Sequence, residues 1–98
     1  MMTVIVGKPG QAPEVQQIEN TLEGMQAVVE GPIQRVWMGP FEVYFNEEGR
    51  LQGLPFNGIV AGYDILGTFF VCKPNEEESQ GLTESEITKV LKLLKASR

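Results

Sequence analysis

Residues 62–72 read GYDILGTFFVC, and the last five of them, Thr68–Cys72, form an almost uninterrupted apolar run. A short run that is apolar at successive positions, and not only at alternate ones, is typical of a strand covered on both faces. We therefore expect Gly62–Cys72 to supply a strand near the middle of a sheet. The other elements can be predicted from there along the chain.

Shorter strands are expected before this run. Met2–Val6 is rich in β-branched residues and precedes a Pro-Gly turn pair, which predicts a strand. Glu14–Glu19 fits either a second strand or the start of a helix; we favour a strand paired with the first, because Asn20 and Glu23 resemble a capping pair that starts a helix after it. Further strands are expected at Arg50–Leu54, Ile33–Met38 and Phe41–Asn46. Apolar and polar residues alternate in the last of these, which predicts one buried face.

Two helices are expected, at Thr21–Glu30 and Glu84–Ala96. The first has an apolar face and ends before a Gly-Pro pair that cannot continue a helix. The second starts at a capping box of Thr83 and Glu86. Its apolar stripe consists of Ile87, Val90, Leu91 and Leu94. These elements predict an α+β fold: a small mixed, mainly antiparallel sheet of four to six strands with both helices packed on it.

The composition predicts one small globular domain in a reducing compartment. The chain has 98 residues, of which 42% are hydrophobic and 21% charged, as in a single domain. Its net charge of −5 disfavours direct binding to nucleic acid phosphates. One cysteine, no signal-like N-terminal segment and no apolar stretch of ~20 residues predict a cytoplasmic protein outside the membrane.

The residue types present disfavour catalysis. The chain has no histidine, the commonest general base and metal ligand, so we expect neither an enzyme nor a metal or other cofactor. Cys72 is interpreted as a buried structural thiol, and Glu76–Glu78 as a solvated charge run and not a cation site. Asp64, the only aspartate, is a candidate functional carboxylate or a turn residue. An enzyme would need a deep, water-shielded cleft in which Asp64 meets a second ionisable group.

The remaining candidate is a binding surface. Arg35 and Trp37 are two residues apart and therefore lie on one face of their expected strand, with Tyr44 and Phe56 expected nearby. Trp, Tyr and Arg anchor protein interfaces because they combine apolar area with a directed polar group. For Trp37, a place in the core is an equal alternative. The same residues could stack on a base and pair with a phosphate, so a nucleotide-like ligand is a second interpretation.

Several short motifs together resemble one protein family. They are KPG at 8–10, IENTLE at 18–23, NEEG at 46–49, GLPFN at 53–57, YDILGTF at 63–69 and LT at 82–83. Over nearly its whole length the chain is similar to the domain of unknown function 3846 family, although Gly58 stands where the family pattern usually has Arg. The resemblance implies a small cytoplasmic protein of phage or mobile-element origin, without an established activity. The polar positions it points to, which could equally be turn and cap residues, are Asn46, Asn57, Tyr63, Asp64 and Thr68.

These observations favour a function by binding. We expect a small non-enzymatic phage or mobile-element accessory protein that binds a host protein, for example to counter host defence. The alternatives are a sponge for a small nucleotide-like signalling molecule, held by Arg35 and aromatic residues, and an acidic mimic of nucleic acid. A mimic needs carboxylates aligned along one face, whereas Glu84 and Glu86 are explained by the start of a helix. Because a chain this short has a thin core, a homodimer is compatible with each hypothesis.

Overall fold

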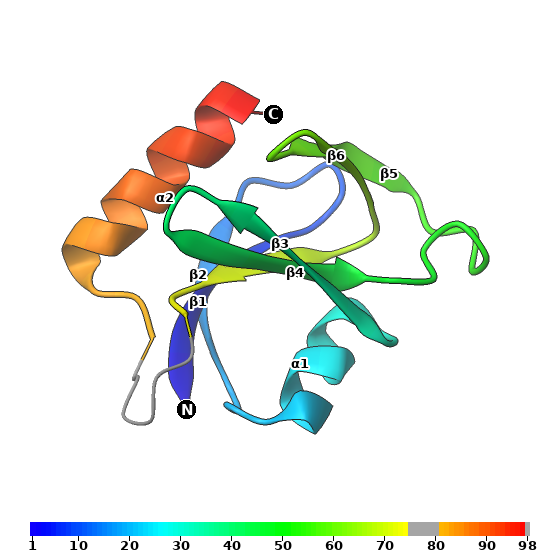
Figure 1. The fold of residues 1–98 in the computed structure, drawn as a ribbon, viewed down its shortest axis with the longest axis horizontal. Coiled ribbons are helices and arrows are strands. Elements are labelled where there is room, and N and C mark those ends of the chain that lie inside the picture. Colours follow the sequence, from blue (N-terminus) through cyan, green and yellow to red (C-terminus); the bar gives the residue numbers. More distant parts are fainter. Residues whose placement is uncertain (75–80, 98) are drawn as a thin grey trace.

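The computed structural model describes residues 1–74 and 81–97 and has the predicted α+β architecture (Figure 1). The predicted charge run at 76–78 lies outside the described residues. In chain order the elements are β1 (Met2–Gly7), β2 (Glu14–Ile18), α1 (Leu22–Val29), β3 (Ile33–Met38), β4 (Phe41–Asn46), β5 (Phe56–Val60), β6 (Tyr63–Leu66), β7 (Phe69–Cys72) and α2 (Glu84–Ser97).

Five strands form the main sheet, in the order β2-β1-β7-β4-β3, and every neighbouring pair is antiparallel. β5 and β6 form a separate two-stranded ribbon. The predicted pairing of the first two strands is confirmed, with Met2 opposite Ile18. The predicted central strand is also confirmed, because β7 lies third of five and all four of its residues are buried. An apolar run without alternation thus marked the strand that has a layer on each side.

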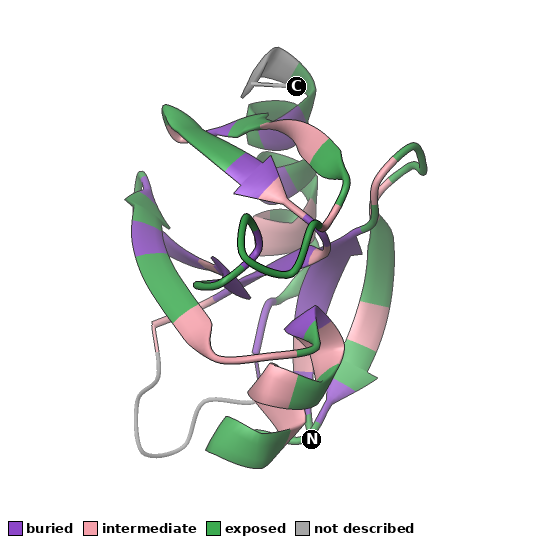
Figure 2. Ribbon diagram, turned by 90° about the vertical axis from the view of Figure 1, so that its right-hand side faces the viewer, coloured by how far each residue is buried: buried purple, intermediate pink, exposed green. Residues whose placement is uncertain are grey.

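The main sheet lies between two layers. On one face, α1 packs in a cluster that contains Phe70, Cys72 and Val29. We call this the α1 face. On the other, the α2 face, α2 and the ribbon share a larger cluster with Val71. Phe70 and Val71 are neighbours in β7 and point to opposite faces, as successive strand residues do. Figure 2 shows buried residues concentrated on the central strands of the sheet. In the described part of the chain, neither helix could cross a membrane.

The start of α1 differs from its prediction by one residue. Thr21, and not Asn20, is the N-cap: its hydroxyl oxygen accepts a hydrogen bond from the Gly24 N–H at 3.0 Å. Thr21 has the extended backbone that an N-cap requires, with φ −137° and ψ 158°. The helix ends at the predicted place, with Glu30 in the left-handed conformation at φ 63°.

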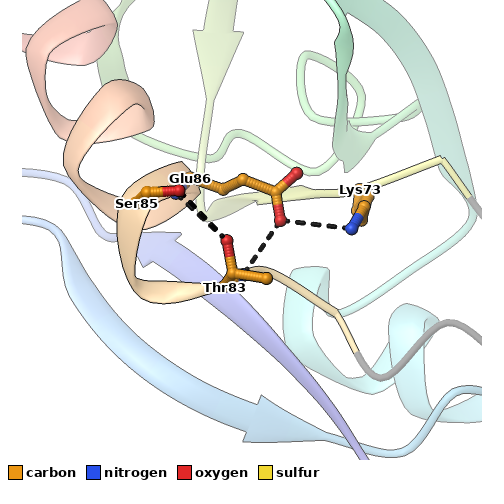
Figure 3. Close-up of polar contacts among 4 residues, drawn as sticks. All are labelled: Lys73, Thr83, Ser85 and Glu86. Carbon is orange, nitrogen blue, oxygen red and sulfur yellow. Dashed lines mark hydrogen bonds and ion pairs between the residues drawn. The ribbon is translucent and has the colours of Figure 1, made fainter.

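The start of α2 confirms the predicted capping box (Figure 3). The Thr83 N–H donates to Glu86 Oε1 at 3.0 Å, and the Glu86 N–H donates to Thr83 Oγ1 at 3.3 Å. Lys73 Nζ lies 3.2 Å from the same Glu86 oxygen, and these contacts, led by the Thr83 N–H, lower the pKa of the Glu86 carboxyl. Val90 and Leu94 of the predicted apolar stripe are buried, whereas Leu91 is exposed because it lies at the edge of the stripe.

Between residues 47 and 72, two predictions are wrong and one strand was not predicted. Arg50–Leu54 is not a strand, because its backbone groups are used by local turns, such as Gln52 N–H to Glu48 C=O at 2.9 Å. Phe56–Val60 was not predicted and forms β5. Gly62–Cys72 forms two strands and not one. The extended conformation is interrupted at Gly67, whose φ of 83° lies in the left-handed region.

Candidate functional site

The structure divides the seven candidate residues into two groups. Arg35, Trp37 and Tyr44 lie together on β3 and β4 of the main sheet. The other four lie on the ribbon, whose inner residues Val60 and Ile65 pack in the cluster of the α2 face. The members of this second group are Phe56, Asn57, Tyr63 and Asp64. The expected closeness of Phe56 to Trp37 is therefore wrong, because the chain leaves the main sheet after β4 and crosses to the other layer.

The first group is built by the register of two strands. β3 and β4 pair so that Arg35 is opposite Tyr44 and Trp37 is opposite Glu42. Directly opposite residues point to the same face, so these four side chains share the α1 face. We call this set the Arg–Trp surface. Trp37 is 50% exposed, which excludes the core alternative, and the Arg35 guanidinium carbon lies 5.3 Å from the centroid of the Trp37 ring. This is a cation–π contact.

A buried carboxylate organises this surface. Glu42 is only 3% exposed, and its Oε2 accepts a hydrogen bond from the Tyr44 hydroxyl at 2.5 Å. The same oxygen lies 3.5 Å from Arg35 Nη1. The Tyr44 ring stacks on Phe70 with centroids 5.2 Å apart, which places its hydroxyl at the carboxylate. The guanidinium and the phenol are therefore both oriented by one buried charge.

Glu42 was not among the predicted site residues, because the alternation in its strand predicts that it points outward from a half-buried sheet. β4 is instead covered on both faces, and five of its six residues are buried. The sequence does contain a signal for this burial. Glu42 lies two residues before Tyr44, and their strand is joined by a two-residue turn to the strand that contains Arg35 and Trp37. Because the register of such a hairpin brings these residues together, a buried carboxylate could have been predicted from it.

The Glu42 carboxylate also affects the pKa of two neighbouring groups, the Tyr44 phenol and the Cys72 thiol. Burial and the hydrogen bond to Glu42 raise the pKa of the Tyr44 phenol, so it stays protonated and remains a donor. Burial, with a contribution from the Glu42 charge, raises the pKa of the Cys72 thiol to about 12. The thiolate is the reactive form of cysteine, so this thiol is inert near neutral pH. The buried position predicted for Cys72 is confirmed.

The polar residues of the ribbon have other roles. The Asn57 amide nitrogen donates to the Gly7 carbonyl at 3.0 Å and to the Gly67 carbonyl at 2.8 Å. It thus ties the ribbon to β1 and to the turn before β7. Asn46 is similar: its amide nitrogen donates to the Val29 carbonyl at 3.1 Å and its oxygen accepts from the Glu48 N–H at 2.7 Å.

Asp64 and Tyr63 border a cavity of about 370 Å³ between the ribbon and the turn after β4. Asp64 Oδ2 lies 3.8 Å from Arg50 Nη2, but the two side chains are 54% and 80% exposed. The cavity is therefore open to water at these two charged residues. Phe56 and Tyr63 of the ribbon are both about half exposed.

In chemical terms the Arg–Trp surface combines hydrogen-bond donors with an exposed aromatic ring. Arg35 meets Glu42 through one nitrogen at 3.5 Å and is 53% exposed, so the guanidinium has N–H groups for an additional acceptor. Within residues 1–74 and 81–97, no three carboxylate or thiol side chains gather into a group that could hold a metal ion. The arrangement supports recognition by contact.

Comparison with known proteins gives one match. A family model with the description "Domain of unknown function (DUF3846)" matches residues 2–95. Neither the curated proteins nor the solved structures contain a match to the chain. The matched range includes all seven described strands, α1, and α2 apart from its last two residues. The similarity therefore extends over the fold and does not depend on one motif.

Proposed function

The chain belongs to the family of the domain of unknown function DUF3846, and we propose that it is a non-enzymatic binding protein whose partner is another protein. The proposal places it in the cytoplasm of a host cell, as the product of a phage or other mobile element that acts on a host protein, for example to counter host defence. One observation carries it: an exposed Arg35–Trp37 pair is held in place by a buried carboxylate.

The residue types support protein recognition. Trp, Tyr and Arg are the commonest residues whose truncation strongly weakens protein interfaces. Here one residue of each type lies on two paired strands. Trp37 and Arg35 are each about half exposed, so both retain surface that a partner could cover.

The contacts within the surface also support this function. Ordering a flexible side chain at an interface costs about 0.5–1.5 kcal/mol. Arg35 already contacts Glu42 and Trp37, and Tyr44 already contacts Glu42 and Phe70. Part of that ordering cost is thus met when the protein folds, which leaves more of the contact energy for binding.

The test is capture of a partner with matched variants. Tagged wild-type chain is used to isolate partners from lysate of candidate host cells, and the affinity of a purified partner is then measured for Trp37→Ala, Arg35→Ala and Phe56→Ala. We expect the first two to bind at least about tenfold more weakly, as for residues at the centre of an interface. Phe56→Ala removes an equally exposed aromatic residue from the ribbon and should bind normally.

Two results would contradict the proposal. One is a partner lost with Phe56→Ala but retained with Trp37→Ala and Arg35→Ala. The other is a rise in melting temperature with cyclic or linear nucleotides that depends on Arg35, since a ligand that binds the native state stabilises it. That result would favour the nucleotide sponge.

A further inference from the structure

β3 is an open edge of the main sheet. It is last in the order β2-β1-β7-β4-β3, and no described strand pairs with its outer side. Open edges present unpaired backbone N–H and C=O groups and are commonly protected by Pro, Lys or a bulge. β3 has six residues in continuous register with β4 and contains neither Pro nor Lys. It is therefore suited to pair with another strand.

The direction of its backbone groups follows from one hydrogen bond. In an antiparallel pair, directly opposite residues alternate between hydrogen-bonded and non-hydrogen-bonded pairs. The Glu47 N–H donates to the Pro32 carbonyl at 2.8 Å, which makes this a bonded pair one step beyond β3. Gln34, Val36 and Met38 then bond to β4. Arg35 and Trp37 are at the non-hydrogen-bonded positions of this pairing, so their backbone N–H and C=O groups point away from β4, toward the open edge.

We propose that a second copy of this chain pairs with this edge, β3 antiparallel to β3 about a two-fold axis at Val36. In this register Arg35 is opposite Trp37 of the partner subunit, and Trp37 is opposite Arg35 of the partner subunit. The proposal does not rest on the proposed function, because it concerns the purified chain alone.

The register follows from the side chains. Only outward-directed residues can form the hydrogen-bonded pairs, and two registers keep five residues of each strand paired. One of them places Arg35 opposite Arg35 of the partner subunit, and like charges directly opposite are unfavourable. The other register places the guanidinium of each copy against the indole ring of the partner subunit. This cation–π interaction is attractive, and the two-fold symmetry makes it occur twice. On the α2 face it brings Val36 opposite Val36 of the partner subunit, which extends an apolar cluster.

The edge is thus complementary to itself, which is why we choose a second copy over an unrelated strand. The pairing would join two five-stranded sheets into one. It would also bring both Arg–Trp surfaces together at the two-fold axis, because Arg35 and Trp37 lie on the same face in each copy. One continuous, symmetric surface would result.

The test is sedimentation equilibrium of the full chain from about 1 to 500 µM. The wild type should change with concentration from a mass of 10.9 kDa toward twice that value. Trp37→Lys places a cation opposite Arg35 of the partner subunit and should weaken the dimer at least about tenfold. Trp37→Glu places an anion there and should keep the dimer within about threefold of the wild type. Phe56→Ala, on the ribbon, should have no effect.

The two charged variants also control for folding. Within one chain, position 37 is opposite Glu42, so Trp37→Lys should fold at least as well as Trp37→Glu. Circular dichroism of both variants checks that they are folded, so that a loss of dimer in the lysine variant is not assigned to unfolding. The proposal is overturned if the wild type stays monomeric throughout the range, or if both charged variants dimerise equally, which would indicate another register or surface.

Discussion

The Arg–Trp surface and the ribbon contain similar residues, but only the first has side chains that converge on one another. On β3 and β4, a cation, an indole and a phenol meet around a carboxylate that is 3% exposed. On the ribbon, Asn57 binds backbone carbonyls and Asp64 forms an exposed ion pair. Convergence on a buried carboxylate, and not residue type, therefore distinguishes the candidate site from polar residues that support a turn.

The largest effect is expected where the buried charge is removed. Glu42→Ala takes the acceptor from the Tyr44 hydroxyl and leaves a space in the sheet, so we expect a loss of about 3 kcal/mol in the free energy of unfolding. Glu42→Leu combined with Tyr44→Phe removes donor and acceptor together and should recover most of it. Urea unfolding measures both. If the double variant is the less stable one, the carboxylate does not organise this surface.

Cutting the ribbon from the sheet should have the next largest effect. Asn57→Ala removes two hydrogen bonds to backbone carbonyls, which should lower the free energy of unfolding by about 2 kcal/mol. Because Asn57 supports structure and not recognition, affinity for a partner should be unchanged under conditions where the variant is folded. Backbone amide hydrogens should exchange faster in the variant than in the wild type, and this acceleration should be larger in β5 and β6 than in β3 and β4. Equal acceleration in both regions would show that the ribbon is not a separate unit.

Alkaline pH should destabilise the protein through Cys72, which is buried on the α1 face of the main sheet. The pKa of the Cys72 thiol is raised from its ordinary value of 9.0 to about 12, so above pH 9 the unfolded chain loses a proton that the native protein keeps. Stability should therefore fall by about 1 kcal/mol per pH unit between about pH 9 and 12. Cys72→Ala should show a shallower dependence in urea unfolding at each pH. An identical slope would mean that the thiol does not differ between the two states.

The smallest effect is expected at the exposed ion pair of the ribbon. Asp64→Asn and Arg50→Gln should each change the free energy of unfolding by less than about 0.5 kcal/mol, because exposed pairs contribute little in water. The change should shrink further at high salt. A loss comparable to that of Glu42→Ala, measured in the same urea series, would mean that the two regions are not different in kind.

The candidate site was predicted in part. Arg35, Trp37 and Tyr44 were recognised because residue type and strand alternation are visible in a single sequence, and the structure brings them together. Glu42 was missed because its position between Trp37 of β3 and Cys72 of β7 depends on pairing with strands from separate parts of the chain. Phe56 was wrongly placed beside Trp37, since no local pattern shows that β5 leaves the main sheet.

Local patterns were sufficient to predict the central strand and both helices, because apolar runs, caps and turns act between residues close in the chain. In contrast, the joint burial of Glu42 with Tyr44 and the position of β3 at the edge of the sheet are visible only in the folded structure. The physical reason is that burial and pairing depend on the register and layering of distant segments. The same alternation of Glu42 and Tyr44 would have been solvated on a sheet with one bare face, and is a buried hydrogen-bonded pair on this one.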